Sequence, residues 1–205
     1  MSAPHPVSLD SASEHVFRTI LCAAFATPST APLQQEFCEL LPPAVERRGG
    51  QTLQVSGERL LAGFPTCQAA SWCALEIQFG LHLRNSTAAD VLAVRIGLNS
   101  GPVEGEDVAP HVGEVAAKLE AAGAAGEILL SPSAFAELHD VEDFAILKTP
   151  KIVALKGGAI EVYEIVWRAC DPKATRPPQP NERQVLLAAG SAKAGLFHRL
   201  LKWGK

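Results

Sequence analysis

The stretch 91–131 most constrains the fold, because its apolar pattern alone predicts three elements. Apolar side chains alternate with small or polar ones over residues 92–99, which is the period of a strand with one face on a core. Residues 112–122 repeat apolar side chains at the interval of one helix face, and Gly123 closes the repeat. A short apolar run at 128–130 follows and ends at Ser131-Pro132. The stretch therefore predicts a strand, a loop, a helix and a second strand.

Similar patterns occur on both sides of this stretch. We expect a strand at 15–25, a helix at 33–48, a hairpin within 49–64 that turns at Ser56-Gly57, a helix at 67–84, a short helix at 134–138, and strands at 144–147 and 160–166. Gly97, Gly101 and Gly105 are interpreted as turn residues. This order favours an α+β fold, an antiparallel sheet with helices packed on one face, over an alternating parallel fold.

Composition and charge exclude several classes of function. At 205 residues, 47% of them hydrophobic, the chain has room for one medium domain and a tail. It has no apolar run long enough to span a membrane and no secretion signal at its start. Its five cysteines form no C-x-x-C pair and are interpreted as small core residues in a reducing cytoplasm. The net charge is −4, and residues from 181 onward carry +4, so the remainder carries −8 (−4 minus +4). That charge argues against nucleic-acid binding by the main domain.

The two ends of the chain differ from the middle. Residues 1–14 have the composition of a disordered leader, 15–168 form the expected domain, and 169–181 are a proline-rich linker. Residues 182–205 are predicted to form a basic amphipathic helix. Three interpretations of this tail stay open, which are docking on its own domain or a partner chain, contact with an anionic membrane surface, and disorder.

Three segments carry a resemblance to a known family. VRIGLNSGPV and VAAKLEAAGAAGEILLSPSAF resemble the strings RIGIHTGPV, VNxAARLE and GEILVS of class III adenylate/guanylate cyclase catalytic domains. GGQTLQVSGERLLAGF is similar to the family's hairpin GGxxxKxxGDxxLAxF, and LKGGAIEVYEI is similar to its closing strand pair. The resemblance covers residues 15–167 and implies a ferredoxin-like core, which agrees with the α+β pattern.

The resemblance also implies a site, which departs from the family's at the metal positions. Such cyclases use two aspartates to hold two Mg²⁺ ions, because hard cations prefer carboxylate oxygens and share the charge of phosphoryl transfer. Ala24 stands where the first aspartate is expected, and it has no ligand atom. Glu58 stands where the second is expected. It is interpreted either as a weak residual ligand or as an ordinary solvated hairpin carboxylate.

The family's other site residues, contributed across a dimer interface, are also replaced. Gln54 stands at the base-recognising lysine, Glu114 at the asparagine and Lys118 at the arginine of VNxAARLE. Lys118 keeps the charge but loses the bidentate fork, and its spacing from Glu114 also fits a surface ion pair. The remaining base-specificity position falls in the loop 104–111.

These departures predict a catalytically inactive cyclase-like domain, a dimerising regulatory or binding module in intracellular signalling. The alternative is a divergent active cyclase that makes cAMP or cGMP with Mg²⁺ or Mn²⁺ through Glu58, and a third possibility is a structural interaction domain without a ligand. The expected partner is a second copy or another cyclase-like domain, with a nucleotide as candidate ligand and no nucleic acid. No cofactor is expected unless the chain is active. The expected location is the cytoplasm, with the inner membrane surface as a peripheral site.

Overall fold

A computed structural model of the protein describes residues 18–104, 107–108, 110–138, 141, 143–155 and 158–167. The predicted leader (1–14), linker (169–181) and amphipathic tail (182–205) lie outside the described residues. Within them the chain forms helices and strands whose bounds are as follows: β1 Thr19–Phe25, α1 Ala31–Arg47, β2 Gln51–Val55, β3 Arg59–Phe64, α2 Cys67–Asn85, β4 Val94–Ser100, β5 Val103–Glu104, β6 Asp107–Val108, α3 Pro110–Ala122, β7 Ile128–Leu130, α4 Pro132–Leu138, β8 Ile146–Leu155 and β9 Gly158–Ile165.

One seven-stranded sheet organises the domain, in the order β2-β3-β1-β4-β7-β9-β8. Its first four strands, with α1 and α2 as their connections, form the ferredoxin-like unit that the sequence predicts, and all of their pairings are antiparallel. The pairing of β4 with β7 is parallel, and α3 is the crossover that such a pairing requires. The predicted α+β class is confirmed.

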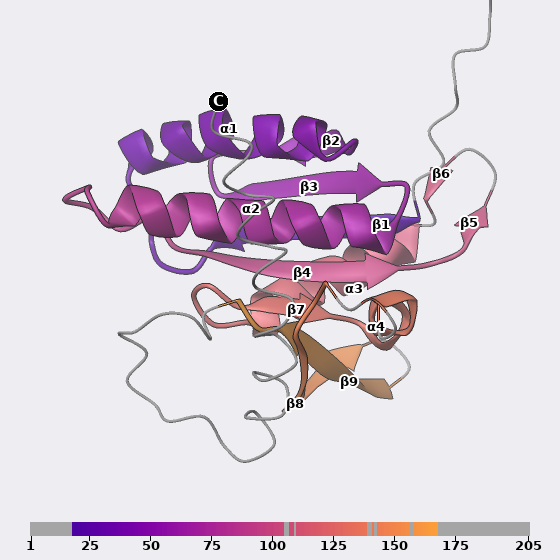
Figure 1. Cartoon of the computed structure of the whole chain (residues 1–205). Helices are drawn as coiled ribbons and strands as arrows, with labels where there is room; N and C mark the ends of the chain where they lie inside the picture. The colour runs from indigo at the N-terminus through magenta and orange to yellow at the C-terminus, as the bar shows by residue number, and fades with distance from the viewer. Residues whose placement is uncertain are drawn as a thin grey trace, which may run out of the picture.

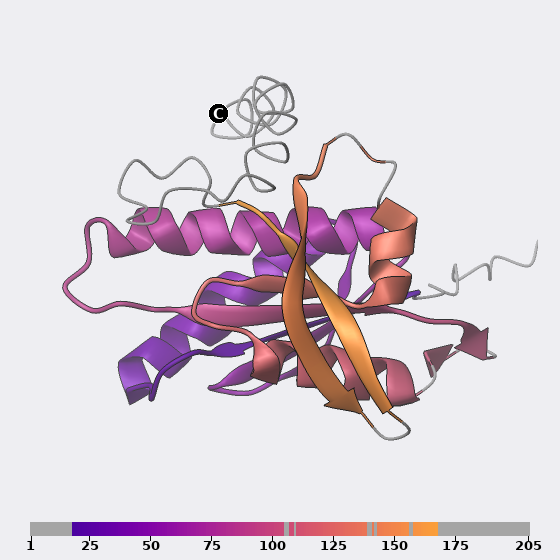
Figure 2. The same ribbon diagram turned by 90° about the horizontal axis from the view of Figure 1, so that it is seen from below.

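The prediction that the helices pack on one face is wrong for α3. Every residue of β1 is buried, so both faces of the sheet are covered at this strand. Leu21 and Phe25 belong to the core shared with α1, α2 and α4, whereas Ile20 and Cys22 pack with Val112 of α3. Figures 1 and 2 show α3 on the side of the sheet opposite α2. The second apolar face of β1 must also be buried, and α3 buries it.

Gly97 is not a turn residue, contrary to the expectation from sequence. It lies inside β4, directly beneath α3. A Cβ atom at this position would lie 2.2 Å from the backbone oxygen of Ala116 and 2.5 Å from the backbone nitrogen of Glu120. Only glycine therefore lets α3 approach the sheet so closely.

Three boundaries also differ from the predicted ones. The loop expected at 104–111 contains the short paired strands β5 and β6. β8 extends far beyond the predicted 144–147, and its pairing with β9 shifts register between Lys148 and Ile152. β1 begins at Thr19, and residues 15–17 lie outside the described residues. None of the described helices combines the length and hydropathy that a membrane crossing requires.

The described cysteines are free thiols, and three of them are core residues as predicted. Burial raises the pKa of Cys22 and of Cys73 to about 12, and that of Cys67 to about 11. These thiols stay protonated at neutral pH and are therefore poor nucleophiles and metal ligands.

Candidate functional site

The first metal position of the resemblance lies in the middle of the sheet. Ala24 of β1 is in register with Arg59 of β3 on one side and with Arg95 of β4 on the other. Residues directly opposite each other in a sheet place their side chains on the same face. Ala24, a residue only 4% exposed, is therefore flanked by two arginine side chains on the face that α3 covers.

Both arginines bind the same buried carboxylate on α3, and we call Arg59, Arg95 and Glu120 the Glu120 cluster. The side chain of Glu120 has no exposed surface. Its Oε2 accepts a hydrogen bond of 3.2 Å from Arg59 Nη2, and its Oε1 accepts from Arg95 Nε at 2.9 Å. A buried carboxylate is costly unless it is paired and hydrogen-bonded. The two arginines meet that requirement, and they tie α3 to two strands.

The cluster makes this position unsuited to a cation. Two guanidinium groups and one carboxylate leave one net positive charge beside Ala24, because arginine stays protonated in proteins. Cys22, two residues earlier on the same face, is a protonated thiol, and its pKa is raised mainly by burial and also by the charge of Glu120. The side chains of Ala24 and Cys22 therefore offer no ligand that could replace the missing aspartate.

The second metal position, Glu58, adjoins the first but is held by a different set of partners. The backbone oxygen of Glu58 accepts a hydrogen bond of 3.1 Å from the backbone nitrogen of Phe25. The Glu58 side chain is exposed, and its Oε1 accepts from Ser29 Oγ and Gln34 Nε2, each at 3.2 Å. These contacts join the β2–β3 turn to the start of α1, as expected for a solvated hairpin carboxylate.

The residues present do not fit a two-aspartate magnesium site. Mg²⁺ needs a near-octahedral set of oxygen ligands, usually including one or two carboxylates. Ala24 offers none, and the carboxylate of Glu58 is already engaged by two side chains. Among the residues that the structure describes, no three His, Cys, Asp or Glu side chains gather as metal ligands would.

The remaining predicted positions lie on the domain surface. Lys118 Nζ and Glu114 Oε1 form an ion pair of 3.0 Å across one turn of α3, which confirms the surface-pair interpretation. Gln54 is exposed on the edge strand β2, at an irregularity in the pairing of β2 with β3. The structure thus brings together Ala24 with Glu58, and Glu114 with Lys118.

Sequence reasoning missed the Glu120 cluster. A signal was present, since Glu120 follows Val112 and Ala116 at intervals of four residues and so shares the buried face of the helix. Arg59 could not be found in this way, because its approach to Ala24 depends on the strand register.

Comparison with solved structures identifies the family. The adenylate/guanylate cyclase/hydrolase from Silicibacter pomeroyi is similar, with 31% identity, coverage of 74% of this chain and 96% of that protein, and a TM-score of 0.61. The guanylate cyclase domain of RhGC from Catenaria anguillulae in complex with GTP covers 74% and 97%, with 17% identity and a TM-score of 0.60. A non-canonical dimeric guanylyl cyclase domain from Blastocladiella emersonii covers 72% and 94%, with 16% identity and a TM-score of 0.55.

No family model and no curated protein matches the chain. The first of these similarities combines substantial identity with nearly complete coverage, and the others share the fold. The chain therefore belongs to the class III adenylate/guanylate cyclase family.

Proposed function

We propose that this chain is a catalytically inactive cyclase domain that acts inside the cell as a regulatory or binding module, by pairing with another cyclase-like chain. The observation that carries the proposal is the environment of Ala24. A position that needs a carboxylate for Mg²⁺ has a methyl group between Arg59 and Arg95, and both arginines bind Glu120.

Magnitudes support inactivity. Removal of one preorganised transition-state donor costs about 10²–10³ in rate. Here a metal ligand is absent at Ala24, the amide of an asparagine is replaced by the negative Glu114, and the lysine that would contact the base is Gln54. Because a metal ligand is lost together with the lysine and asparagine positions, we expect a rate at the uncatalysed background.

A second chain would not restore the site by pairing. In the family, one chain supplies the metal aspartates and the other supplies the lysine, asparagine and arginine. This chain departs in both sets, at Ala24 and at Gln54, Glu114 and Lys118. In a pair with an active cyclase chain, it would therefore act by supporting or blocking its partner.

The edge of the sheet supports pairing. β2 is an edge strand, and its Leu53 and Val55 side chains are exposed. Apolar side chains on an open edge favour association with another chain. A similar guanylyl cyclase domain from Blastocladiella emersonii is described as a non-canonical dimer, which also supports pairing. Light scattering should give a dimer mass that falls toward the monomer in Leu53→Lys, and a monomer in the wild type would contradict pairing with itself.

A cyclase assay on the purified full chain tests inactivity. ATP and GTP are each supplied with Mg²⁺ and then with Mn²⁺, and cyclic nucleotide is measured against a protein-free blank. We expect no product above the blank. Metal-dependent product that disappears in Glu58→Ala but persists in Glu39→Ala, an exposed carboxylate on α1, would instead establish a divergent active cyclase.

A further inference from the structure

An apolar groove runs between α1 and α2, on the face of the domain opposite α3. It has a volume of about 300 Å³. Figure 1 shows the two helices side by side. Each helix contributes five lining residues, which are Glu36, Leu40, Leu41, Ala44 and Arg47 of α1, and Glu76, Ile77, Gly80, Leu81 and Arg84 of α2.

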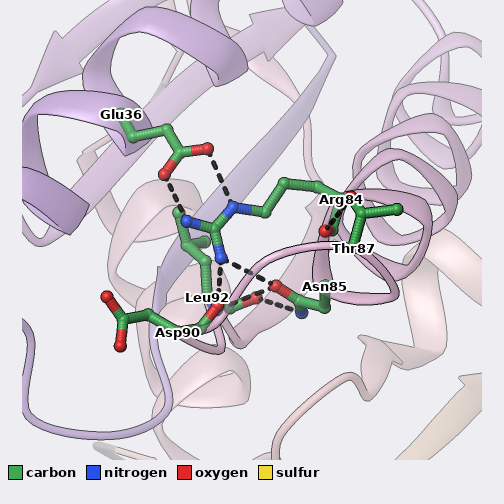
Figure 3. Close-up of polar contacts among 6 residues, drawn as sticks. All are labelled: Glu36, Arg84, Asn85, Thr87, Asp90 and Leu92. Carbon is green, nitrogen blue, oxygen red and sulfur yellow. Dashed lines mark hydrogen bonds and ion pairs between the residues drawn. The ribbon is translucent and has the colours of Figure 1, made fainter.

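Ion pairs close both ends of this groove and leave its middle apolar. At one end Arg84 donates to both carboxylate oxygens of Glu36, at 2.8 and 2.6 Å, and so lowers the pKa of Glu36. Figure 3 shows that the same guanidinium also reaches Asn85 and the backbone oxygen of Asp90. At the other end Arg47 pairs with Glu76 at 2.7 Å. The charged side chains at the two ends, which form the rim of the groove, are thus paired with each other. The apolar middle is left to contact another surface.

The middle of the groove is open. Leu40 is 44% exposed there, although it is a large apolar side chain. A Cβ atom added to Gly80 would meet no heavy atom of the described residues within 4 Å, so packing inside the domain does not require glycine. Glycine inside a helix costs about 1 kcal/mol relative to alanine. A glycine and an exposed leucine facing one groove fit the close approach of another helix.

The chain leaves the described domain beside α2, and this helix lies between the exit point and the groove. Trp167 packs edge-on against Phe79 of α2, with 5.4 Å between ring centroids, and its Nε1 donates to the backbone oxygen of Gly126 at 2.6 Å. Residues 168–181 could span roughly 46 Å when extended. That reach exceeds the diameter of about 10 Å of the helix that separates Trp167 from the groove.

The tail beyond this linker matches the groove in length, polarity and charge. The distance between the ion pairs, from Glu36 to Arg47, corresponds to roughly 16 Å of helix, and the apolar face from Leu196 to Trp203 would occupy roughly 10 Å. α1 carries Glu36, Glu39 and Glu46 against Arg47, and α2 carries Glu76 against Arg84. Their combined charge is −2, whereas residues 182–205 carry +4 (one acid against five bases).

We propose that residues 193–205 of the same chain dock as an amphipathic helix in the α1–α2 groove. Leu196, Leu200 and neighbouring apolar side chains face Leu40 and Gly80, and the basic side chains lie toward the acidic surface of α1. A tethered segment has an effective concentration of about 1 mM, so an intrinsic Kd of about 100 µM is enough for about nine-tenths occupancy. The proposal does not depend on whether the cyclase site is active.

Disulfide trapping in the full chain tests this docking. Gly80→Cys with Leu200→Cys, in a Cys170→Ser background, places two thiols at the expected contact, and Gly80 has room for the new side chain. Gln68→Cys with Leu200→Cys is the matched control, because Gln68 is exposed on the same helix but roughly 18 Å from Gly80. Under mild oxidation, peptide mass mapping should find at least about tenfold more intramolecular disulfide in the groove pair.

Hydrogen exchange in the otherwise native chain provides a second readout. Leu196→Asp with Leu200→Asp should accelerate exchange in α1 and α2, whereas His198→Asp on the polar face of the tail should not. Equal trapping at Gln68 and Gly80 would overturn the proposal. Disulfides that join two chains would also overturn it, because they would place a second copy in the groove. The absence of trapping, together with vesicle binding that Leu196→Asp with Leu200→Asp abolishes, would overturn it as well.

Discussion

The two faces of the sheet use the same chemistry, arginine paired with glutamate, at very different depths. On the α3 face Glu120 has no exposed surface and holds Arg59 and Arg95 over Ala24. On the α1–α2 face the Glu36–Arg84 pair is partly exposed and lies at the rim of a groove. Because Glu120 is buried, the Glu120 cluster is required for the stability of the fold, and it excludes a cation. Because the Glu36–Arg84 pair is partly exposed, it contributes only modestly to stability.

Removal of one carboxylate from each face should give the largest difference. Glu120→Gln weakens two charge-assisted contacts of a fully buried side chain, although it leaves behind arginines that are partly exposed, and should lower the free energy of unfolding by about 1.5–3 kcal/mol. Glu36→Gln, at the partly exposed pair, should cost about 1 kcal/mol or less. Urea denaturation of both variants measures the two values. Equal losses would show that burial does not distinguish the two pairs.

Alanine substitutions at two glycines compare how tightly the two faces are packed. Gly97→Ala forces α3 away from β4, because the new Cβ would meet the backbone oxygen of Ala116 at 2.2 Å, and should destabilise the domain by about 1–3 kcal/mol. Gly80→Ala, compared in a chain that also carries Leu196→Asp with Leu200→Asp and so leaves the groove empty, meets no atom of the described residues and improves helix propensity, so it should stabilise by up to about 1 kcal/mol. Thermal unfolding gives the sign of each change. A neutral Gly97→Ala would mean that α3 is not held tightly against the sheet.

The rim pair should also show a pH dependence. Because Arg84 lowers the pKa of Glu36, the folded state releases this proton more readily than the unfolded state. The contribution to stability is therefore present at neutral pH and lost as the pH falls below the ordinary glutamate pKa of about 4.3. The stability difference between wild type and Glu36→Gln should shrink over that acid range. A difference that is unchanged at low pH would show that the pair contributes through packing alone.

Sequence patterns predicted much of this architecture, and the failures have physical causes. The apolar periods of α1, α2 and β4 were sufficient to predict these elements, because apolar side chains repeat at the helical interval in α1 and α2 and alternate with small or polar ones along β4. The second buried face of the sheet was missed, since β1 reads as a continuous apolar run that does not reveal which helix covers each side. Gly97 was assigned to a turn because a glycine in sequence does not show what crosses it.

The site was predictable only where it depends on motifs. The departures at Ala24, Glu58, Gln54, Glu114 and Lys118 follow from the resemblance alone. The Glu120 cluster required the register of three strands and the position of α3, because Arg59, Arg95 and Glu120 are far apart in the chain. Tertiary pairing, rather than local pattern, created this part of the site.

Manganese binding tests the central claim most directly, because it reports the metal site without relying on catalysis. Electron paramagnetic resonance measures free Mn²⁺ as wild-type protein and, separately, Glu58→Ala are added. If Ala24 and the Glu120 cluster have abolished the metal site, wild type should leave the free Mn²⁺ signal unchanged, as should the variant. Stoichiometric loss of the signal with wild type, but not with Glu58→Ala, would contradict the account.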